Sequence, residues 1–493
     1  MRLQSKGEPA DAARVEVDDH SPTPMPTVEG VEPTPIKRAA PLRFRHRLDG
    51  SLARSTALWR RGRTLALAKP RKTASIAFAI ALVGCVVPLA AMRSKGAADT
   101  RTETSSSATV LDSITSKTDA ASSKTYVPTG ALAGLDLKSM AVDDNGVVAS
   151  AAGGRVARLT VDPKMQNSTM RLLTKSKVPQ AAVVLIEPST GKILAYASKG
   201  GDGKDLAVEA DAPSASVFKI ITGSALVQVA SVPIDTKMCY GGGEQKILAV
   251  DLKDDPKRDL YCATLAQAMG RSINAIFAKL ASRKLTAPDL NAIASQFGYG
   301  GAIPFDVPVA VSKIDLPTDP LAFARTAAGF WNTSLSPLHG ALIAATIANG
   351  GVMMRPFIVD EVLDGTNVIY KAPVPSTLRK VIEPATATAV GTMMLETTTN
   401  GTSFKAFHDG KGKAFIPGVE IAGKTGTLNQ TQPAKLFTWF VGFAPAKAPK
   451  IAIATLVVND PVWKVKANVL AREVLQAYFA AQGAPGVQAP PVD

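Results

Sequence analysis

The chain has 493 residues, of which 46% are hydrophobic, so it has ample material for a core and room for two or three domains. Its formal net charge of +15 is a feature of many nucleic-acid-binding proteins. Much of this basicity, however, lies directly ahead of one apolar segment, and a membrane explains that arrangement better. We therefore expect a membrane-anchored globular protein with no nucleic-acid partner.

The apolar segment, Thr73–Met92, has no charged residue and is about 20 residues long, enough for a helix that crosses a bilayer. Twelve Lys or Arg lie between Pro35 and Lys72, against the single acid Asp49. The positive-inside rule therefore places residues 1–72 in the cytoplasm and the rest outside the inner (plasma) membrane, after a single crossing. A buried core helix is the alternative. A cleaved signal peptide fits worse, because 72 residues precede the apolar core.

Composition and hydrophobic periodicity divide the chain into regions. We predict a disordered basic tail at 1–72, a transmembrane helix at 73–92, a Ser/Thr/Ala-rich extracytoplasmic linker at 93–154, a globular domain at 155–482 and a flexible tail at 483–493. In the globular domain we expect strands at 157–161, 181–186, 192–197, 419–427, 437–443 and 450–458, and helices at 163–175, 216–229, 264–281, 287–297, 320–328, 337–349, 384–397 and 464–480. Strands at both ends with a helical middle indicate one α+β domain whose sheet is assembled from distant segments.

Ser216 and Lys219 stand at the start of one predicted helix. Residues i and i+3 share a helix face, so the two side chains should lie side by side. A serine hydroxyl needs an adjacent base to act as a nucleophile, and a lysine is such a base only where burial or a neighbouring cation lowers its pKa. The spacing alone is weak evidence, since Ser189–Lys192 repeats it between two strands, where it is typical of a hairpin turn.

Three cysteines are present, and Cys85 falls within the predicted membrane helix. Cys239 and Cys262 would lie outside the membrane in an oxidising compartment, where a disulfide between them would close a loop of about two dozen residues and contribute about 3 kcal/mol. Two unpaired thiols are the alternative, because the distance between the cysteines is not given by sequence.

Ser272 and Asn274 interrupt the apolar pattern of the helix predicted at 264–281. Taken alone they fit ordinary solvated positions. The functional alternative is a Ser-x-Asn element, in which the hydroxyl relays a proton between Lys219 and a leaving group and the amide holds a substrate carbonyl.

The run Ile421–Thr427 places a lysine, two threonines and two glycines on a predicted strand. In a cleft, Lys424 would lower the pKa of the neighbouring base and bind a carboxylate together with the hydroxyls of Thr425 and Thr427. Gly426 would let a substrate backbone lie close along the strand edge. A Gly-rich strand with a solvated lysine is the alternative, and the two earlier motifs argue against it.

In this order, Ser216-Val-Phe-Lys219, Ser272-Ile-Asn274 and Lys424-Thr-Gly426 resemble the three motifs of the penicillin-binding transpeptidase family. The resemblance extends over about Leu159–Phe479. It implies an α+β fold like that of serine beta-lactamases, with an antiparallel sheet flanked by helices and a helical subdomain. The chain departs from the family before its nucleophile, with Ser214-Ala215 in place of Pro-Gly, which puts the turn into the helix in question.

The resemblance also implies a reaction. Ser216 attacks the carbonyl between two terminal D-alanines of a peptidoglycan stem peptide, and Lys219 takes its proton. Ser272 passes a proton to the departing D-alanine, and Asn274 positions the peptide. An amine of a neighbouring stem then resolves the acyl-enzyme, which makes a cross-link.

The remaining implied roles concern binding. Lys424, Thr425 and Thr427 hold the terminal carboxylate, and the backbone N–H groups of Ser216 and Thr427 form the oxyanion hole. Beta-lactams mimic the dipeptide and acylate the serine. No metal or organic cofactor is implied, and a membrane-bound cell-wall synthesis complex is the expected partner.

Other functions compete with this one. A D,D-carboxypeptidase shares the first step and gives the acyl group to water. A class D-like beta-lactamase fits Phe297–Gly300 but has an apolar residue where Asn274 stands. A non-catalytic scaffold or beta-lactam sensor would not need an intact set of motifs. A Ser-His-Asp hydrolase is disfavoured because His339, in an apolar helix, is most simply a core residue, and no Gly-x-Ser-x-Gly elbow is present.

Overall fold

A computed structural model describes residues 125–144, 146–200 and 203–491. The helix predicted at 73–92 lies outside these residues, as do the tail ahead of it and the first part of the predicted linker. Within the described part of the chain, no helix is both long enough and apolar enough to cross a bilayer.

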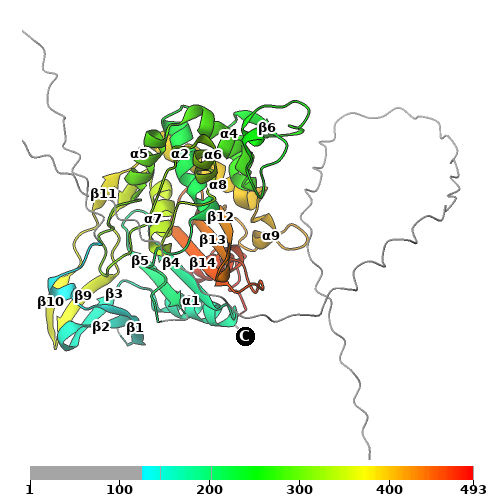
Figure 1. Cartoon of the computed structure of the whole chain (residues 1–493). Helices are drawn as coiled ribbons and strands as arrows, with labels where there is room; N and C mark the ends of the chain where they lie inside the picture. The colour runs from blue at the N-terminus through cyan, green and yellow to red at the C-terminus, as the bar shows by residue number, and fades with distance from the viewer. Residues whose placement is uncertain (1–124, 145, 201–202, 492–493) are drawn as a thin grey trace, which may run out of the picture. The chain divides into compact units, whose positions relative to one another are not determined.

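The core is a five-stranded antiparallel sheet (Figure 1), in the order β12, β13, β14, β4, β5. Its strands are β4 (Gln180–Ile186), β5 (Ile193–Lys199), β12 (Ala422–Thr431), β13 (Ala434–Ala444) and β14 (Ile451–Asn459). Every residue of β14 is buried, because this central strand is covered on both faces. The sheet therefore joins the two ends of the domain, and the predicted α+β architecture with a β4–β5 hairpin is confirmed.

Helices cover both faces of this sheet. Those on one face are α1 (Pro163–Lys175) and α10 (Ala467–Ala481), and those on the other are α7 (Pro337–Ala348) and α8 (Pro384–Thr399). Helix α1 begins where Asp162 accepts a hydrogen bond from the Met165 backbone N–H at 2.8 Å and Pro163 takes the first helical position. Helix α7 is buried along almost its whole length, including His339, whose ring nitrogens lie 2.8 Å from Ser312 Oγ and from the Phe297 carbonyl. His339 is thus a satisfied core residue, as predicted.

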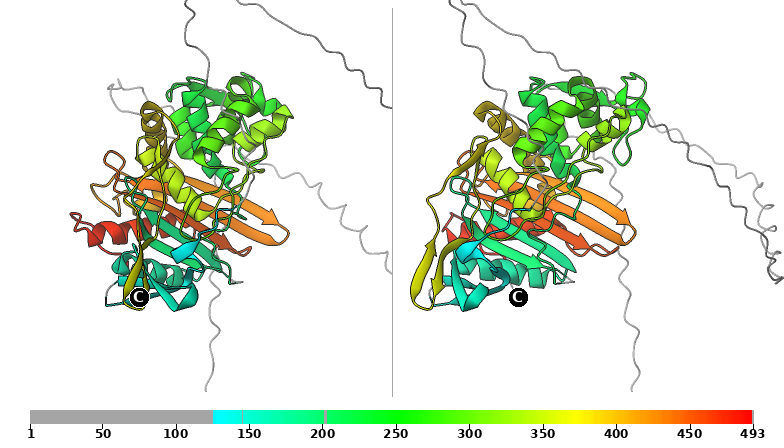
Figure 2. Two further views of the ribbon diagram at one scale, coloured as in Figure 1. Left: turned by 90° about the vertical axis from the view of Figure 1, so that its left-hand side faces the viewer. Right: turned by 60° about the vertical axis from the view of Figure 1, so that its left-hand side comes forward.

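A helical region lies at one end of the sheet (Figures 1 and 2). Its helices are α2 (Lys219–Gln228), α3 (Leu265–Arg271), α4 (Asn274–Lys284), α5 (Ala287–Phe297) and α6 (Pro320–Ala327), with the short η3 (Ala215–Phe218) against α2 and η4 (Ala249–Leu252) against α4. The short α9 (Phe404–Phe407) contacts α8 and α10. The single helix predicted at 264–281 is wrong. The helix is interrupted between α3 and α4, because Ser272 adopts the left-handed conformation with φ of 60° and caps α3.

A second antiparallel sheet lies at the other end of the central sheet from the helical region (Figure 2), in the order β1, β2, β3, β9, β10. Its strands are β1 (Asp136–Asp143), β2 (Gly146–Ala151), β3 (Arg155–Leu159), β9 (Val359–Asp364) and β10 (Asn367–Lys371). The linker predicted to run to residue 154 therefore ends too late. Alternating buried side chains such as Val147 and Ala149 bring this stretch into the hydrophobic core.

The C-terminal segment also differs from the flexible tail predicted at 483–493. The Lys175 ammonium donates to the Pro491 carbonyl and the Gln476 amide donates to the Gln488 carbonyl, both at 2.7 Å. These bonds fasten the described part of the segment to α1 and α10.

Two small two-stranded antiparallel sheets complete the described structure. Strand β8 (Val352–Met354) pairs with β11 (Thr377–Lys380), and β6 (Lys237–Tyr240) pairs with β7 (Tyr261–Thr264). Cys239 and Cys262 face each other across β6 and β7 and form a disulfide. The predicted pairing is therefore present in the structure.

Candidate active site

Ser216 lies in the 3-10 turn η3, one turn ahead of α2. Side chains three residues apart are nearly superimposed in a 3-10 turn, and the Lys219 Nζ accordingly lies 2.9 Å from Ser216 Oγ. Ser216 is partly exposed, whereas Lys219 is completely buried. The sequence prediction of a serine beside a buried lysine is confirmed.

The Lys219 amine lies among three oxygen atoms. Besides Ser216 Oγ, it is 2.6 Å from Asn274 Oδ1 and 2.6 Å from the Ala328 carbonyl oxygen at the end of α6. A neutral amine has two N–H bonds and one lone pair. The Asn274 amide oxygen and the Ala328 carbonyl oxygen can only accept hydrogen bonds. They therefore accept from both N–H groups of the amine and leave its lone pair free to take the proton of Ser216.

Burial lowers the pKa of Lys219 well below its usual value, and the charge of Lys424 lowers it further. Burial also lowers the pKa of Lys424, from 10.5 to about 7. The amine of Lys219 is therefore available as a base near neutral pH, for both of the reasons predicted from sequence.

The break between α3 and α4 aims two polar side chains at these lysines. Lys424 Nζ donates to Ser272 Oγ at 2.9 Å, while Asn274, the first residue of α4, reaches Lys219. The predicted relay through Ser272 thus has its contact with Lys424; no Ser272–Lys219 hydrogen bond occurs among the described residues. Asn274 also donates through Nδ2 to the Glu244 carbonyl.

Strand β12 lies at one edge of the central sheet and runs beside the turn of Ser216. A Cβ atom at Gly426 would lie 3.2 Å from Val217 Cγ2 and 3.3 Å from Ala215 Cβ, so the glycine permits this close approach. Thr427 is exposed, next to the free edge. A peptide could therefore add along this edge as an extra strand.

The Thr425 hydroxyl lies 2.7 Å from that of Thr402, in the loop between α8 and α9. Thr402 was missed from the sequence, as were the carbonyl groups of Ala328 and Glu244. Backbone carbonyls have no sequence signal, and a threonine in a polar loop is too common to be informative. The catalytic and substrate-binding residues predicted from the sequence lie together around Ser216, the break between α3 and α4, and strand β12.

Ala215 has φ of 49°, a left-handed conformation that favours glycine. It directly precedes the nucleophile, where the sequence departs from the family pattern. The backbone keeps the turn although the residue has changed, at a cost of about 1 kcal/mol. The second Ser-x-x-Lys run, Ser189–Lys192, lies in the β4–β5 turn as predicted, where the Thr190 hydroxyl donates to Glu187.

The comparisons with known proteins agree with this geometry. The family described as penicillin binding protein transpeptidase domain matches residues 181–476. Peptidoglycan D,D-transpeptidase PbpA of Mycobacterium tuberculosis is 29% identical over 355 residues, which cover 62% of this chain and 68% of that protein. Stage V sporulation protein D of Bacillus subtilis is 25% identical over 328 residues, 61% of this chain but only 49% of its own length.

Among solved structures, the imipenem acyl-enzyme complex of penicillin-binding protein A from M. tuberculosis superimposes with a TM-score of 0.53 at 28% identity. The likeness covers 66% of this chain and 79% of that one. The matched region contains all three motifs that surround Ser216. The chain therefore belongs to the penicillin-binding protein transpeptidase domain family.

Proposed function

We propose that this protein is a serine D,D-transpeptidase that cross-links peptidoglycan stem peptides through an acyl-enzyme on Ser216. The observation that carries the proposal is the buried Lys219 amine, 2.9 Å from Ser216 Oγ, with two other oxygens to take its N–H bonds. The M. tuberculosis relative is named a peptidoglycan D,D-transpeptidase, and its solved imipenem complex is an acyl-enzyme. Both names support the same chemistry here.

In the first step, Ser216 Oγ attacks the carbonyl carbon of the D-Ala-D-Ala peptide bond while its proton moves to the lone pair of Lys219. The backbone N–H groups of Ser216 and Thr427 stabilise the oxyanion that forms. Ser272, held by Lys424, gives its hydroxyl proton to the leaving amine as the C–N bond breaks and takes up the proton that Lys219 received from Ser216. An amine of a second stem then attacks the resulting ester and gives up a proton through Ser272 to Lys219. Lys219 returns a proton to Ser216 Oγ as the ester C–O bond breaks, which completes the cross-link.

Binding of the substrate carboxylate falls to Lys424, Thr425 and Thr427 on β12. The Lys424 amine is buried and its pKa is about 7, so the negative charge of a bound carboxylate favours its ammonium form near neutral pH. Beta-lactams that carry a carboxylate next to the reactive amide would enter the same site.

We further propose that the protein is held in the inner (plasma) membrane by one helix at 73–92, with its catalytic domain on the outer side, in a cell-wall synthesis complex. The apolar segment and the twelve basic residues ahead of it support this arrangement. Protease treatment of intact spheroplasts tests it. Residues 155–482 should be digested and an epitope within residues 1–72 should be protected; the reverse pattern would contradict the proposed orientation.

The catalytic proposal is tested by labelling the full-length chain, purified in detergent, with a fluorescent penicillin. A stable adduct should form on the wild type and be absent from Ser216→Ala. Incubation with a D-Ala-D-Ala stem peptide and an acceptor amine should then yield the cross-linked product.

Other outcomes would point elsewhere. Release of D-alanine without cross-linking would favour a D,D-carboxypeptidase. A rapidly lost adduct with hydrolysed drug would favour a beta-lactamase, and no adduct on a folded protein would favour a scaffold.

A further inference from the structure

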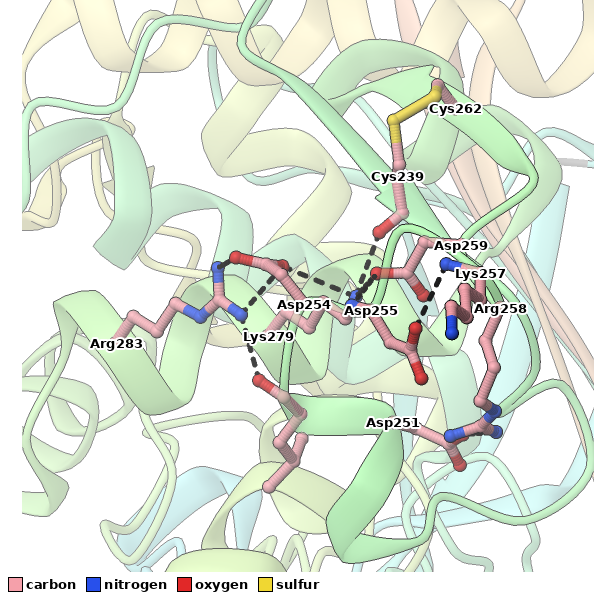
Figure 3. A network of polar contacts seen from close by, with 11 residues as sticks. Cys239, Asp251, Asp254, Asp255, Lys257, Arg258, Asp259, Cys262, Lys279 and Arg283 are labelled. Carbon is pink, nitrogen blue, oxygen red and sulfur yellow. Dashed lines mark hydrogen bonds and ion pairs between the residues drawn. A yellow bond between two sulfur atoms is a disulfide. The ribbon is translucent and has the colours of Figure 1, made fainter.

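A second buried lysine lies outside the catalytic set. Lys279, in the middle of α4, has no exposed surface. Its ammonium lies 2.6 Å from Asp259 Oδ2, 3.5 Å from Asp254 Oδ1 and 2.9 Å from the Cys239 carbonyl oxygen (Figure 3). All three partners belong to, or directly flank, the segment between the disulfide cysteines, which we call the anchored loop (residues 240–261).

The anchored loop is fastened along α4 at further points. Arg283 binds Asp254 through two N–H groups at 2.9 and 3.0 Å and also donates to the Leu252 carbonyl (Figure 3). Within the loop, Arg258 pairs with Asp251 at 3.0 Å. The disulfide joins the two ends of the loop, so these contacts hold a closed ring of chain rather than a free strand.

The same loop enters the active site. At Gly243, where φ is 82°, a Cβ atom would lie 3.1 Å from Ala275 Cβ, so the loop backbone lies against the first turn of α4. The next residue, Glu244, accepts the hydrogen bond from Asn274 Nδ2 through its carbonyl oxygen. Further along, Arg325 of α6 donates to the Ile247 carbonyl at 2.7 and 2.9 Å.

This contact decides which way the amide of Asn274 points. With Nδ2 directed at the Glu244 carbonyl, Oδ1 must face Lys219, where it accepts a hydrogen bond from the amine at 2.6 Å. A flipped amide would instead direct an N–H group at the lone pair of Lys219. That N–H would compete with the proton of Ser216 for the same lone pair, and the base would be weakened.

We propose that the anchored loop is a positioning element of the active site, in which Lys279 holds the loop on α4 so that the Glu244 carbonyl fixes the amide of Asn274. The inference rests on the proposed acyl-enzyme function. Lys279 touches neither the substrate nor the reacting atoms in this scheme. It acts through Glu244 and Asn274 on the base.

The test compares Lys279→Met with Lys284→Met, the same change at an exposed lysine on the same helix. Each is made in the wild-type and the Asn274→Ala backgrounds of the full-length chain in detergent. The second-order rate constant of acylation by fluorescent penicillin is measured at equal folded fraction. Lys279→Met should slow acylation about tenfold where Asn274 is present and less than about twofold where it is absent. Lys284→Met should change neither rate.

Equal slowing in both backgrounds, or none in either, would overturn the proposal, because the effect would then not pass through Asn274. If Lys279→Met does not fold, the double variant Cys239→Ala/Cys262→Ala loosens the same loop and should show the same dependence on Asn274.

Hydrogen exchange provides a readout that needs no activity. Backbone amides of residues 241–248 should exchange faster in Lys279→Met than in the wild type or in Lys284→Met, and unchanged exchange would contradict the anchoring role. A wild type that takes up no penicillin would defeat the proposed function, and the exchange result would still decide whether Lys279 anchors the loop.

Discussion

Within the described residues, two regions bury a lysine completely, and they use it in opposite ways. In the active site, Lys219 lies among neutral oxygens, those of Ser216, Asn274 and Ala328, and its pKa is lowered by burial and further by the charge of a second lysine. In the anchored loop, Lys279 is paired with the carboxylates of Asp259 and Asp254. Neither Lys219 nor Lys279 has exposed surface, so burial alone does not decide whether a lysine acts as a base or as an anchor. The charge of the surrounding groups does, because an acid stabilises the ammonium form and a cation destabilises it.

The largest effect is expected where the pair in the anchored loop is broken. Asp259→Asn leaves the charge of Lys279 without its nearest carboxylate, and should lower the free energy of unfolding by about 3–5 kcal/mol. Asp254→Asn is the matched control, because Asp254 is 66% exposed and its pairs should be worth less than about 1 kcal/mol. Chemical denaturation followed by circular dichroism measures both, and equal losses would contradict the contrast between them.

The next change makes the active site resemble the anchored loop. Asn274→Asp places a carboxylate 2.6 Å from the Lys219 amine and should raise the pKa of that lysine. The base must be neutral to accept the proton of Ser216, so the rate of acylation at pH 7 should fall about 10- to 100-fold. In a plot of acylation rate against pH, the rising limb should move to higher pH.

Asn274→Ala is the control for this experiment, because it removes the same amide without adding charge. It should slow acylation but leave the rising limb of the pH profile at or below its original position. A limb that moves upward equally in both variants would show that the carboxylate is not the cause.

A third change removes the buried Lys424, which has no carboxylate partner within the part of the chain that the structure describes. The pKa of Lys424 is about 7 in the folded protein against its usual 10.5, so the folded state binds fewer protons between these values. Stability should therefore rise as the pH rises from about 7 to about 10.5, with the full penalty present below pH 7. Lys424→Met should raise the free energy of unfolding at pH 7 by about 1–3 kcal/mol and flatten this rise, while activity is lost. A variant less stable than the wild type at pH 7 would contradict this reasoning.

The smallest effect concerns backbone strain beside the nucleophile. Ala215 has φ of 49°, whereas the anchored loop uses a glycine, Gly243, for its left-handed position at 82°. Ala215→Gly should raise the melting temperature through a gain of about 0.5–1 kcal/mol. Ala212→Gly, at a buried alanine of the same segment without a positive φ, should lower it. A loss of stability in both variants would show that the turn at Ala215 is not strained.

Much of the site could be predicted because its geometry is local. The i, i+3 spacing places Ser216 beside Lys219 in any tight helical turn, whether 3-10 or α. Alternation of polar and apolar residues, and short apolar runs, predict the strands of the central sheet. The position of Lys424 on β12 follows because its motif lies within one of these predicted strands. The disulfide could be expected from the oxidising compartment predicted for residues after the apolar segment, and the pairing of β6 with β7 brings its cysteines together.

Tertiary structure decided the rest. The polar Ser272 and Asn274 interrupt an apolar pattern that still predicts one helix, and only the folded structure shows that α3 ends at Ser272 in a left-handed residue. The carbonyl of Ala328, 109 residues from Lys219, carries no side-chain signal, and neither does that of Glu244. The sequence around Lys279 does not distinguish it from a solvated lysine on a helix, because the anchored loop that buries it comes from another part of the chain. Sequence determined the groups that can do the chemistry, because their spacing is set by one turn or one strand. The fold determined which lysine is a base and which is an anchor, because that depends on charges brought in from distant parts of the chain.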